Sequence, residues 1–121
     1  MSMQDLFLAV YTGSKDSARM KAWEKLSEKD RQAKMQEGLA AWQGWVEKHK
    51  ALIAVDGGPL GKTKSIGDHG IKDISNALVG FTVVRAASHD DAAKLFENHP
   101  HFTVFPGEGV EVMPVLPIPG A

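Results

Sequence analysis

The sequence predicts an α+β fold in which two helices pack on one antiparallel sheet. Two segments, residues 27–49 and 88–97, have apolar residues at helical spacing, and each begins at a serine with an acidic residue three positions later. Apolar segments typical of strands lie before, between and after these helices. The resulting order of strand, helix, strand, short strand, strand, helix, strand is the split βαβ arrangement of ferredoxin-like folds.

Composition favours one globular domain over residues 1–121. The chain is 43% hydrophobic and 24% charged, and its length falls in the range of about 100–150 residues that is common for a domain. Fourteen basic and fifteen acidic residues give a net charge of −1, which argues against nucleic acid and anionic membranes as partners. The absence of cysteine excludes a disulfide framework, a thiolate nucleophile and a cysteine metal site.

Nothing in the sequence indicates a targeting or membrane segment. No apolar run approaches the ~20 residues that span a bilayer, and no basic segment precedes the first apolar run. There is also no repeat, low-complexity tract or long linker that would divide the chain. We therefore expect a cytoplasmic protein.

The first strand is predicted at residues 5–11, where an apolar run ends in Thr-Gly-Ser. Residues 14–26 fit either a short helix or an ordered loop. The first long helix follows, with Ser27 and Asp30 in a capping box and an apolar stripe made of Met35, Leu39, Trp42 and Val46. Gly38 and Gly44 predict close packing on the sheet, and Trp45 falls outside the stripe.

The second half of the chain is predicted to be rich in strands and turns. We expect a strand at 51–55, a turn at 56–59, an extended return at 60–67, a second turn at 68–70, a polar loop at 73–76 and the strongest strand at 77–86. A short helix begins at Ser88 and stops before Pro100. The last strand, 110–115, contains Pro114, which favours the edge of the sheet.

The predicted strands carry apolar residues on both faces, whereas two helices cover only one. Residues 6–11, 78–86 and 110–115 all show this pattern. A second copy of the same sheet is the simplest cover for the other face. We therefore expect a homodimer that packs through its sheet faces.

The chain resembles the YCII-related proteins, in particular the subgroup labelled DGPF-like, of the dimeric α+β barrel superfamily. The resemblance rests on an ordered set of segments at residues 42–45, 56–64, 88–92, 99–101 and 110–114, together with the first strand. The DGPF tetrapeptide itself is altered, because a second glycine follows Asp56 and leucine replaces the aromatic residue. Membership implies a ferredoxin-like fold and a cleft between sheet and helix near a dimer interface, in some members with a His–Asp pair.

His99 and Asp56 are the candidate catalytic pair. In an extended segment, His99 and His101 would point the same way, and imidazole titrates near neutral pH. His99 would serve as general acid/base, and Asp56 would orient it. The alternatives are structural: His99 at a helix end, and Asp56 as a turn residue that bonds its own backbone. We expect no metal, because His-x-His without cysteine supplies too few zinc ligands.

Trp42, Lys64, His69 and His101 are the candidate ligand-binding residues. Trp42 would form a wall of the cleft, although aromatic residues at such positions usually fill a core. Lys62 and Lys64 alternate onto one face and would hold an anionic group, or else protect an edge strand. His69 lies in a turn and would form the rim of the cleft, or else a solvated loop.

Two functional hypotheses follow from these residues. The first is a YCII-related protein that binds or converts a small molecule in its cleft, without a cofactor. Reactions on this superfamily fold include isomerisation, lactone chemistry, dehalogenation-like steps and cofactor-free oxygenation. The second hypothesis is a noncatalytic dimeric module that senses a ligand or binds a protein, linked to transcription regulation.

Overall fold

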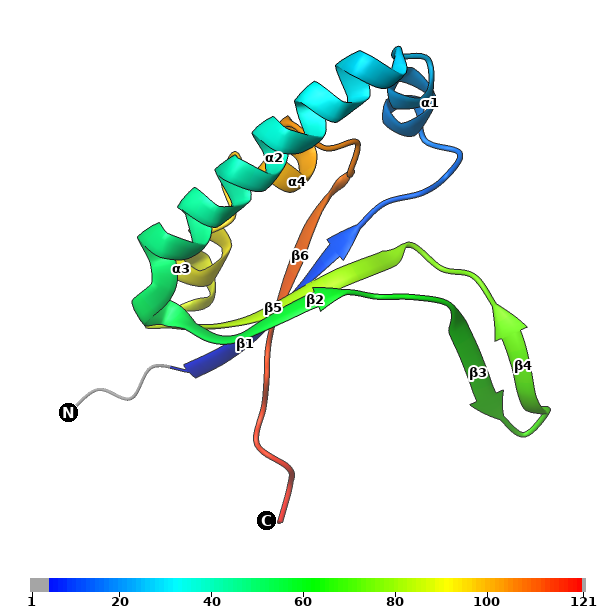
Figure 1. Ribbon diagram of the computed structural model, residues 1–121. Helices are drawn as coiled ribbons and strands as arrows, with labels where there is room; N and C mark the ends of the chain where they lie inside the picture. The colour runs from blue at the N-terminus through cyan, green and yellow to red at the C-terminus, as the bar shows by residue number, and fades with distance from the viewer. Residues whose placement is uncertain (1–4, 121) are drawn as a thin grey trace.

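The computed structural model describes residues 5–120 and contains a four-stranded antiparallel sheet (Figure 1). Its strand order is β2-β5-β1-β6, with every neighbouring pair antiparallel. The strands are β1 (Asp5–Thr12), β2 (Ile53–Pro59), β5 (Leu78–Ala86) and β6 (Gly109–Pro114). Because β1 and β5 lie in the centre with β2 and β6 at the edges, the predicted ferredoxin-like α+β fold is confirmed.

The helices gather on one side of this sheet (Figure 1). They are α1 (Ala18–Glu24), α2 (Glu28–His49), α3 (His89–Lys94) and α4 (Pro100–Thr103), with a short 3-10 turn, η1 (Lys50–Leu52), after α2. The predicted serine caps are confirmed, because the Ser27 hydroxyl accepts from the backbone N–H of Asp30 and the Ser88 hydroxyl from that of Asp91. Of the two possibilities for residues 14–26, the helical one is correct.

The core lies between the sheet and the second half of α2. Phe7, Ala9, Tyr11, Val84, Ala86, Ala92 and Phe96 form it together with Trp45, which is only 8% exposed. The Trp45 Nε1–H donates to the carbonyl oxygen of Leu95 at 2.7 Å. The sequence predicts that the apolar stripe of α2 is buried along its length. This prediction is wrong for the first half of the helix, where Met35 and Leu39 are 48% and 58% exposed. The first half of α2 extends away from the strands toward α1, which leaves that stripe uncovered (Figure 1).

One of the two helical glycines makes a close contact, although not with the sheet. A Cβ atom at Gly38 would lie 2.5 Å from the ring of Phe105, in the loop after α4. A Cβ atom at Gly44 would meet nothing within 4 Å, so the prediction of close packing there is wrong. Because Gly38 has no side chain, the ring of Phe105 can pack directly against α2.

The segment predicted as a turn at residues 56–59 belongs to strand β2. The pairing of β2 with β5 shifts register between Ile53 and Val55 and again between Val55 and Gly58, so the strand is irregular where the turn was expected. Gly57 has a φ of 68°, and a Cβ atom there would lie 2.0 Å from the backbone oxygen of Phe81. This glycine lets β2 bend while it stays paired with β5.

A separate hairpin connects β2 to β5 and projects from one end of the main sheet (Figure 1). It consists of β3 (Thr63–Gly67) and β4 (Gly70–Ile74), joined by the turn that the sequence predicts around Asp68 and His69. Asp73 lies in β4 opposite Lys64, not in a loop as expected.

The face of the main sheet opposite α2 carries exposed apolar side chains. Leu6 and Met113 are each more than a third exposed, and Val115 just after β6 is half exposed. No helix in residues 5–120 packs on this face (Figure 1). Nor does any helix in that part of the chain combine the length and the apolar character needed to cross a bilayer.

We predict that Gly57→Ala lowers the free energy of unfolding by at least about 2 kcal/mol, since it combines a strained φ with a backbone clash. Gly58→Ala is the matched control, because a Cβ atom at Gly58 meets nothing within 4 Å. Urea unfolding of both variants measures the difference. Equal midpoints for the two would contradict the close contact between β2 and β5.

Candidate functional site

A cavity of about 600 Å³ lies between α2 and one end of the sheet, and we call it the central cavity. Most of its wall is apolar or aromatic. The side chains that give it chemical character are Tyr11, Leu39, Trp42, Val46, Asp56, Thr82, His101 and Phe105. These residues come from β1, α2, β2, β5 and the segment around α4, so the cavity exists only in the folded chain.

His101 is a histidine of the central cavity wall. Its Nε2 lies 2.8 Å from the carbonyl oxygen of Thr12, and because a carbonyl only accepts, Nε2 carries the proton. Nδ1 of His101 forms no hydrogen bond with any of residues 5–120, and within them only Nε2 of His99 is a fully buried side-chain atom without a partner. Burial lowers the pKa of His101, against the opposing effect of the bond to Thr12. The result is a neutral imidazole with a free lone pair at Nδ1.

His99 lies behind the cavity wall and acts as the N-cap of α4. The expected extended His-Pro-His segment is wrong, because α4 begins at Pro100 and the Nδ1 of His99 accepts from the backbone N–H of His101 at 3.0 Å. The ring is fully buried, and it stands perpendicular to the ring of Trp42 with 4.4 Å between centroids. Nε2 of His99 therefore carries the proton and has no hydrogen-bond acceptor within residues 5–120. The aromatic rings around it, such as that of Trp45, leave an N–H···π contact as the interaction open to this N–H group.

The protonation state of His99 follows from this burial. Desolvation, followed by repulsion from charge on His101 and on His49, lowers the pKa of His99 to about 3. His99 and Asp56 form no hydrogen bond with each other, and His99 does not line the cavity that Asp56 lines. The structure thus brings Asp56 together with His101 at one cavity and leaves His99 in the layer behind it.

Asp56 lies in β2, is exposed, and is one of the residues that line the cavity. Its backbone oxygen accepts from the hydroxyl of Thr82 at 3.2 Å, and that hydroxyl oxygen lies 2.8 Å from the hydroxyl of Tyr11. Thr82 uses its one hydrogen toward Asp56, so the Tyr11 hydroxyl donates to Thr82. Burial raises the pKa of Tyr11 to about 12, which keeps the phenol neutral. The carboxylate of Asp56 makes no hydrogen bond within residues 5–120, so it does not cap a turn.

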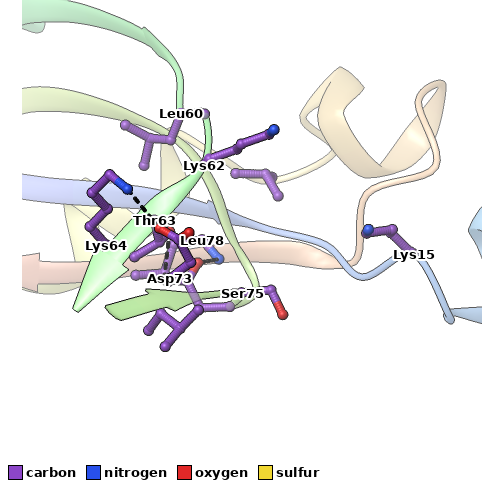
Figure 2. Close-up of a pocket in the computed structure, with 12 residues that line it drawn as sticks. Lys15, Leu60, Lys62, Thr63, Lys64, Asp73, Ser75 and Leu78 are labelled. Carbon is purple, nitrogen blue, oxygen red and sulfur yellow. Dashed lines mark hydrogen bonds and ion pairs between the residues drawn. The ribbon is translucent and has the colours of Figure 1, made fainter. Parts of the chain in front are cut away.

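Trp42 lines the central cavity and is half-buried, with its ring 5.0 Å from that of Tyr11. Lys64 and His69 lie elsewhere, on the projecting hairpin. Lys64 forms an ion pair with Asp73 at 2.7 Å and lines a second cavity at the hairpin base (Figure 2). Across residues 5–120, no three side chains of the His, Asp or Glu type gather in a geometry that would hold a metal ion.

Tyr11, Thr82 and Phe105 are wall residues that the sequence analysis did not single out as site residues. Tyr11 follows Phe7 and Ala9 at alternate positions of β1, so strand alternation carried the signal that it faces the helices. Phe105 reaches the cavity from a loop, and its place depends on the contact with Gly38. No local pattern identifies such a residue.

Comparison with known proteins supports the fold of this chain but does not identify its family. No protein-family profile and no curated protein matches the chain. A solved structure does match: TftG, the 5-chloro-2-hydroxyhydroquinone dehydrochlorinase of Burkholderia phenoliruptrix AC1100, in complex with 2,5-dihydroxybenzoquinone. The alignment has a TM-score of 0.50 and 23% identity, and it covers 88% of this chain and 89% of TftG. At this level of identity, the likeness establishes a shared α+β fold.

We predict that acid destabilises the protein through His99. Because its folded pKa is about 3 and the usual value is 6.5, the unfolded chain takes up the proton first, and stability is lost as pH falls from about 6.5 toward 3. The slope is up to roughly 1.4 kcal/mol per pH unit for this one group. His99→Asn keeps a capping side chain but does not titrate, so urea midpoints between pH 7 and pH 4 should fall less steeply than in wild type. Parallel curves for the two proteins would contradict a neutral, buried His99.

Proposed function

We propose that this protein is a YCII-related member of the dimeric α+β barrel superfamily that binds and converts a small planar molecule in the central cavity. The observation that carries the proposal is that Asp56 and His101 line the same aromatic cavity, and that His101 has Nε2 bound to the Thr12 carbonyl and no partner at Nδ1 within residues 5–120. Family membership is supported by the ordered sequence segments and by the shared fold of TftG. The cavity volume of about 600 Å³ lies within the range of about 300–1,000 Å³ typical of small-molecule sites.

We assign the acid/base role to His101 in place of His99. A neutral imidazole with Nε2–H held by the Thr12 carbonyl offers Nδ1 as the base, and the bond to Thr12 supports the positive charge that forms on proton uptake. Asp56 accepts a hydrogen bond from a hydroxyl group of the ligand and stabilises the imidazolium. His99 is a positioning residue, because its bond to the His101 backbone N–H fixes the first turn of α4.

The nature of the ligand follows from the walls. Trp42 and Phe105 offer flat apolar surfaces, whereas polar groups are few and come from the sheet and from His101 in α4. A hydroxylated aromatic or quinoid ring fits such walls. TftG is a dehydrochlorinase of a hydroxylated, chlorinated ring, and removal of HCl from such a ring requires a base that takes a proton. The proposed reaction class is therefore proton abstraction from a hydroxylated ring, with elimination as one version.

The test is a panel of hydroxylated and chlorinated hydroquinones, including 5-chloro-2-hydroxyhydroquinone, with NMR shift mapping and chloride release as readouts. We expect shifts at Tyr11, Trp42 and His101, and turnover of at least one compound. His101→Gln should lower turnover at least about a hundredfold, the usual contribution of a general base. His89→Gln is the matched control, because the His89 Nε2 also lies 2.7 Å from a backbone carbonyl oxygen, that of Val112, yet His89 lines no central cavity wall.

The outcomes separate the two functional hypotheses. Shifts at the cavity without turnover of any compound would favour the ligand-sensing module over the enzyme. Equal turnover in wild type and His101→Gln would remove the assigned base. Shifts confined to other surfaces would contradict the central cavity as the site.

We also propose that a second copy of the chain covers the open face of the main sheet. Met113 and Leu8 form a cross-strand pair on that face, with Leu6 and Val115 exposed nearby. Monomeric proteins rarely expose so continuous an apolar face, and a self-complementary two-fold contact would cover both copies at once.

Met113→Lys tests the dimer by placing a charge in the proposed interface. Light scattering after size exclusion should give twice 13.1 kDa for wild type and a mass closer to one chain for the variant at micromolar concentration. Met35→Lys, at an exposed methionine of α2, should leave the mass unchanged. A monomeric wild type at these concentrations would contradict the proposal.

A further inference from the structure

Two further cavities adjoin the central cavity at the end of the sheet. A middle cavity of about 490 Å³ shares His101 and Phe105 with the central cavity. A cavity of about 770 Å³ at the base of the β3–β4 hairpin shares Lys15 and Asn76 with the middle one, and Val79 lies in the walls of all three. We call this row of three adjoining cavities the trough.

The hairpin end of the trough is positively charged. Lys15 comes from the loop after β1, whereas Lys62 precedes β3 and Lys64 lies within it. Asp73 neutralises Lys64 through their ion pair, but Lys15 and Lys62 form no ion pair in the part of the chain described. Figure 2 shows the ammonium groups of Lys15 and Lys62 directed toward the open space between the hairpin base and the β1–α1 loop. Two uncompensated positive charges therefore face this cavity.

The polar side chains of the same cavity differ in whether a ligand could hydrogen-bond to them. Asn76 is committed, because its amide donates to the hydroxyl of Thr63 at 3.2 Å and its oxygen accepts from the backbone N–H of Leu78 at 3.0 Å. Ser75 lines the cavity and forms no hydrogen bond within residues 5–120 (Figure 2). A donor thus accompanies the two free lysines.

Acidic and basic side chains are distributed unevenly along the trough. Asp56 lines the central cavity and Asp16 lines the middle cavity, which Lys15 also lines, and neither Asp56 nor Asp16 lines the hairpin cavity. An anionic group on a ligand would be repelled from these positions and attracted to Lys15 and Lys62. The charges therefore give an elongated ligand only one favourable orientation.

We propose that the ligand carries an anionic group, a carboxylate or a phosphate, on a chain that runs from its ring in the central cavity to Lys15 and Lys62. This inference rests on the proposed function, because it takes the central cavity as the ring's site. It names the substrate class more narrowly: an anionic side chain attached to a planar ring. Ser75 donates a hydrogen bond to the same anionic group.

The test compares phenylalkanoates of increasing chain length, from phenylacetate to 6-phenylhexanoate, with their neutral amides. From the chain length that reaches the lysines, we expect each acid to bind at least about threefold tighter than its amide, as exposed ion pairs typically allow. The ratio of acid affinity to amide affinity should fall toward one as the salt concentration is raised, whereas the affinity of the amides should stay constant. Calorimetric titration measures both, and phenylalkyl phosphates of matched length show which anionic group is preferred.

Variants assign the effect to named side chains. Lys15→Gln and Lys62→Gln should each reduce the acid-to-amide ratio without changing amide affinity. Lys72→Gln is the control, because Lys72 is exposed on the same hairpin but does not line the trough. Trp42→Ala should weaken the acids and the amides alike, since it removes a wall of the central cavity.

Each outcome bears on a different claim. Acids and amides that bind equally at every chain length would overturn the anionic subsite and leave the central cavity as a ligand site. Binding of neither series would overturn the central cavity itself. Acid binding that the lysine variants weaken but Trp42→Ala does not change would make the lysines a separate anion site and would overturn the trough.

Discussion

The candidate site depends on one hydrogen bond, from the backbone N–H of His101 to the Nδ1 of His99. This bond begins α4 at Pro100 and turns the chain so that His101 faces Thr12 across the end of β1. It also fixes the tautomer of His99, whose remaining N–H is enclosed by Trp42 and Trp45. A charged imidazole could not accept at Nδ1, so burial and capping both require the neutral form.

The other half of the site depends on the irregular strand β2. Gly57 brings the backbone of β2 so close to Phe81 that no other residue fits without strain. The register shift beside it places Asp56 at the cavity, while its backbone oxygen receives the Thr82 hydroxyl that Tyr11 in turn bonds. A polar chain thus ties three strands together at the floor of an otherwise aromatic cavity. Such irregularities are common beside binding sites because they redirect a side chain.

In the proposed function, two histidines have different roles: His99 positions α4, and His101 transfers the proton. His99 is inaccessible and neutral, which suits a structural cap, whereas His101 has one nitrogen held by a carbonyl and the other free. The trough that extends to Lys15 and Lys62 adds charge selectivity at a distance from this base. Recognition of an anionic group far from the reacting ring would let the site orient its ligand without a lysine beside the base. A lysine there would lower the pKa of the base.

Sequence by itself determined the features that depend on neighbours in the chain. The serine caps of α2 and α3, the hairpin turn around His69 and the strand β5 follow from spacings of two to four residues, and all are present. Tertiary structure decided which face of α2 is buried, why residues 56–59 remain a strand, and which histidine faces the cavity. Those outcomes depend on Phe81, Leu95 and Phe105, residues distant in sequence from the segments they constrain. A local pattern carries no record of such a contact, because the contact forms only when the sheet and the helices are assembled.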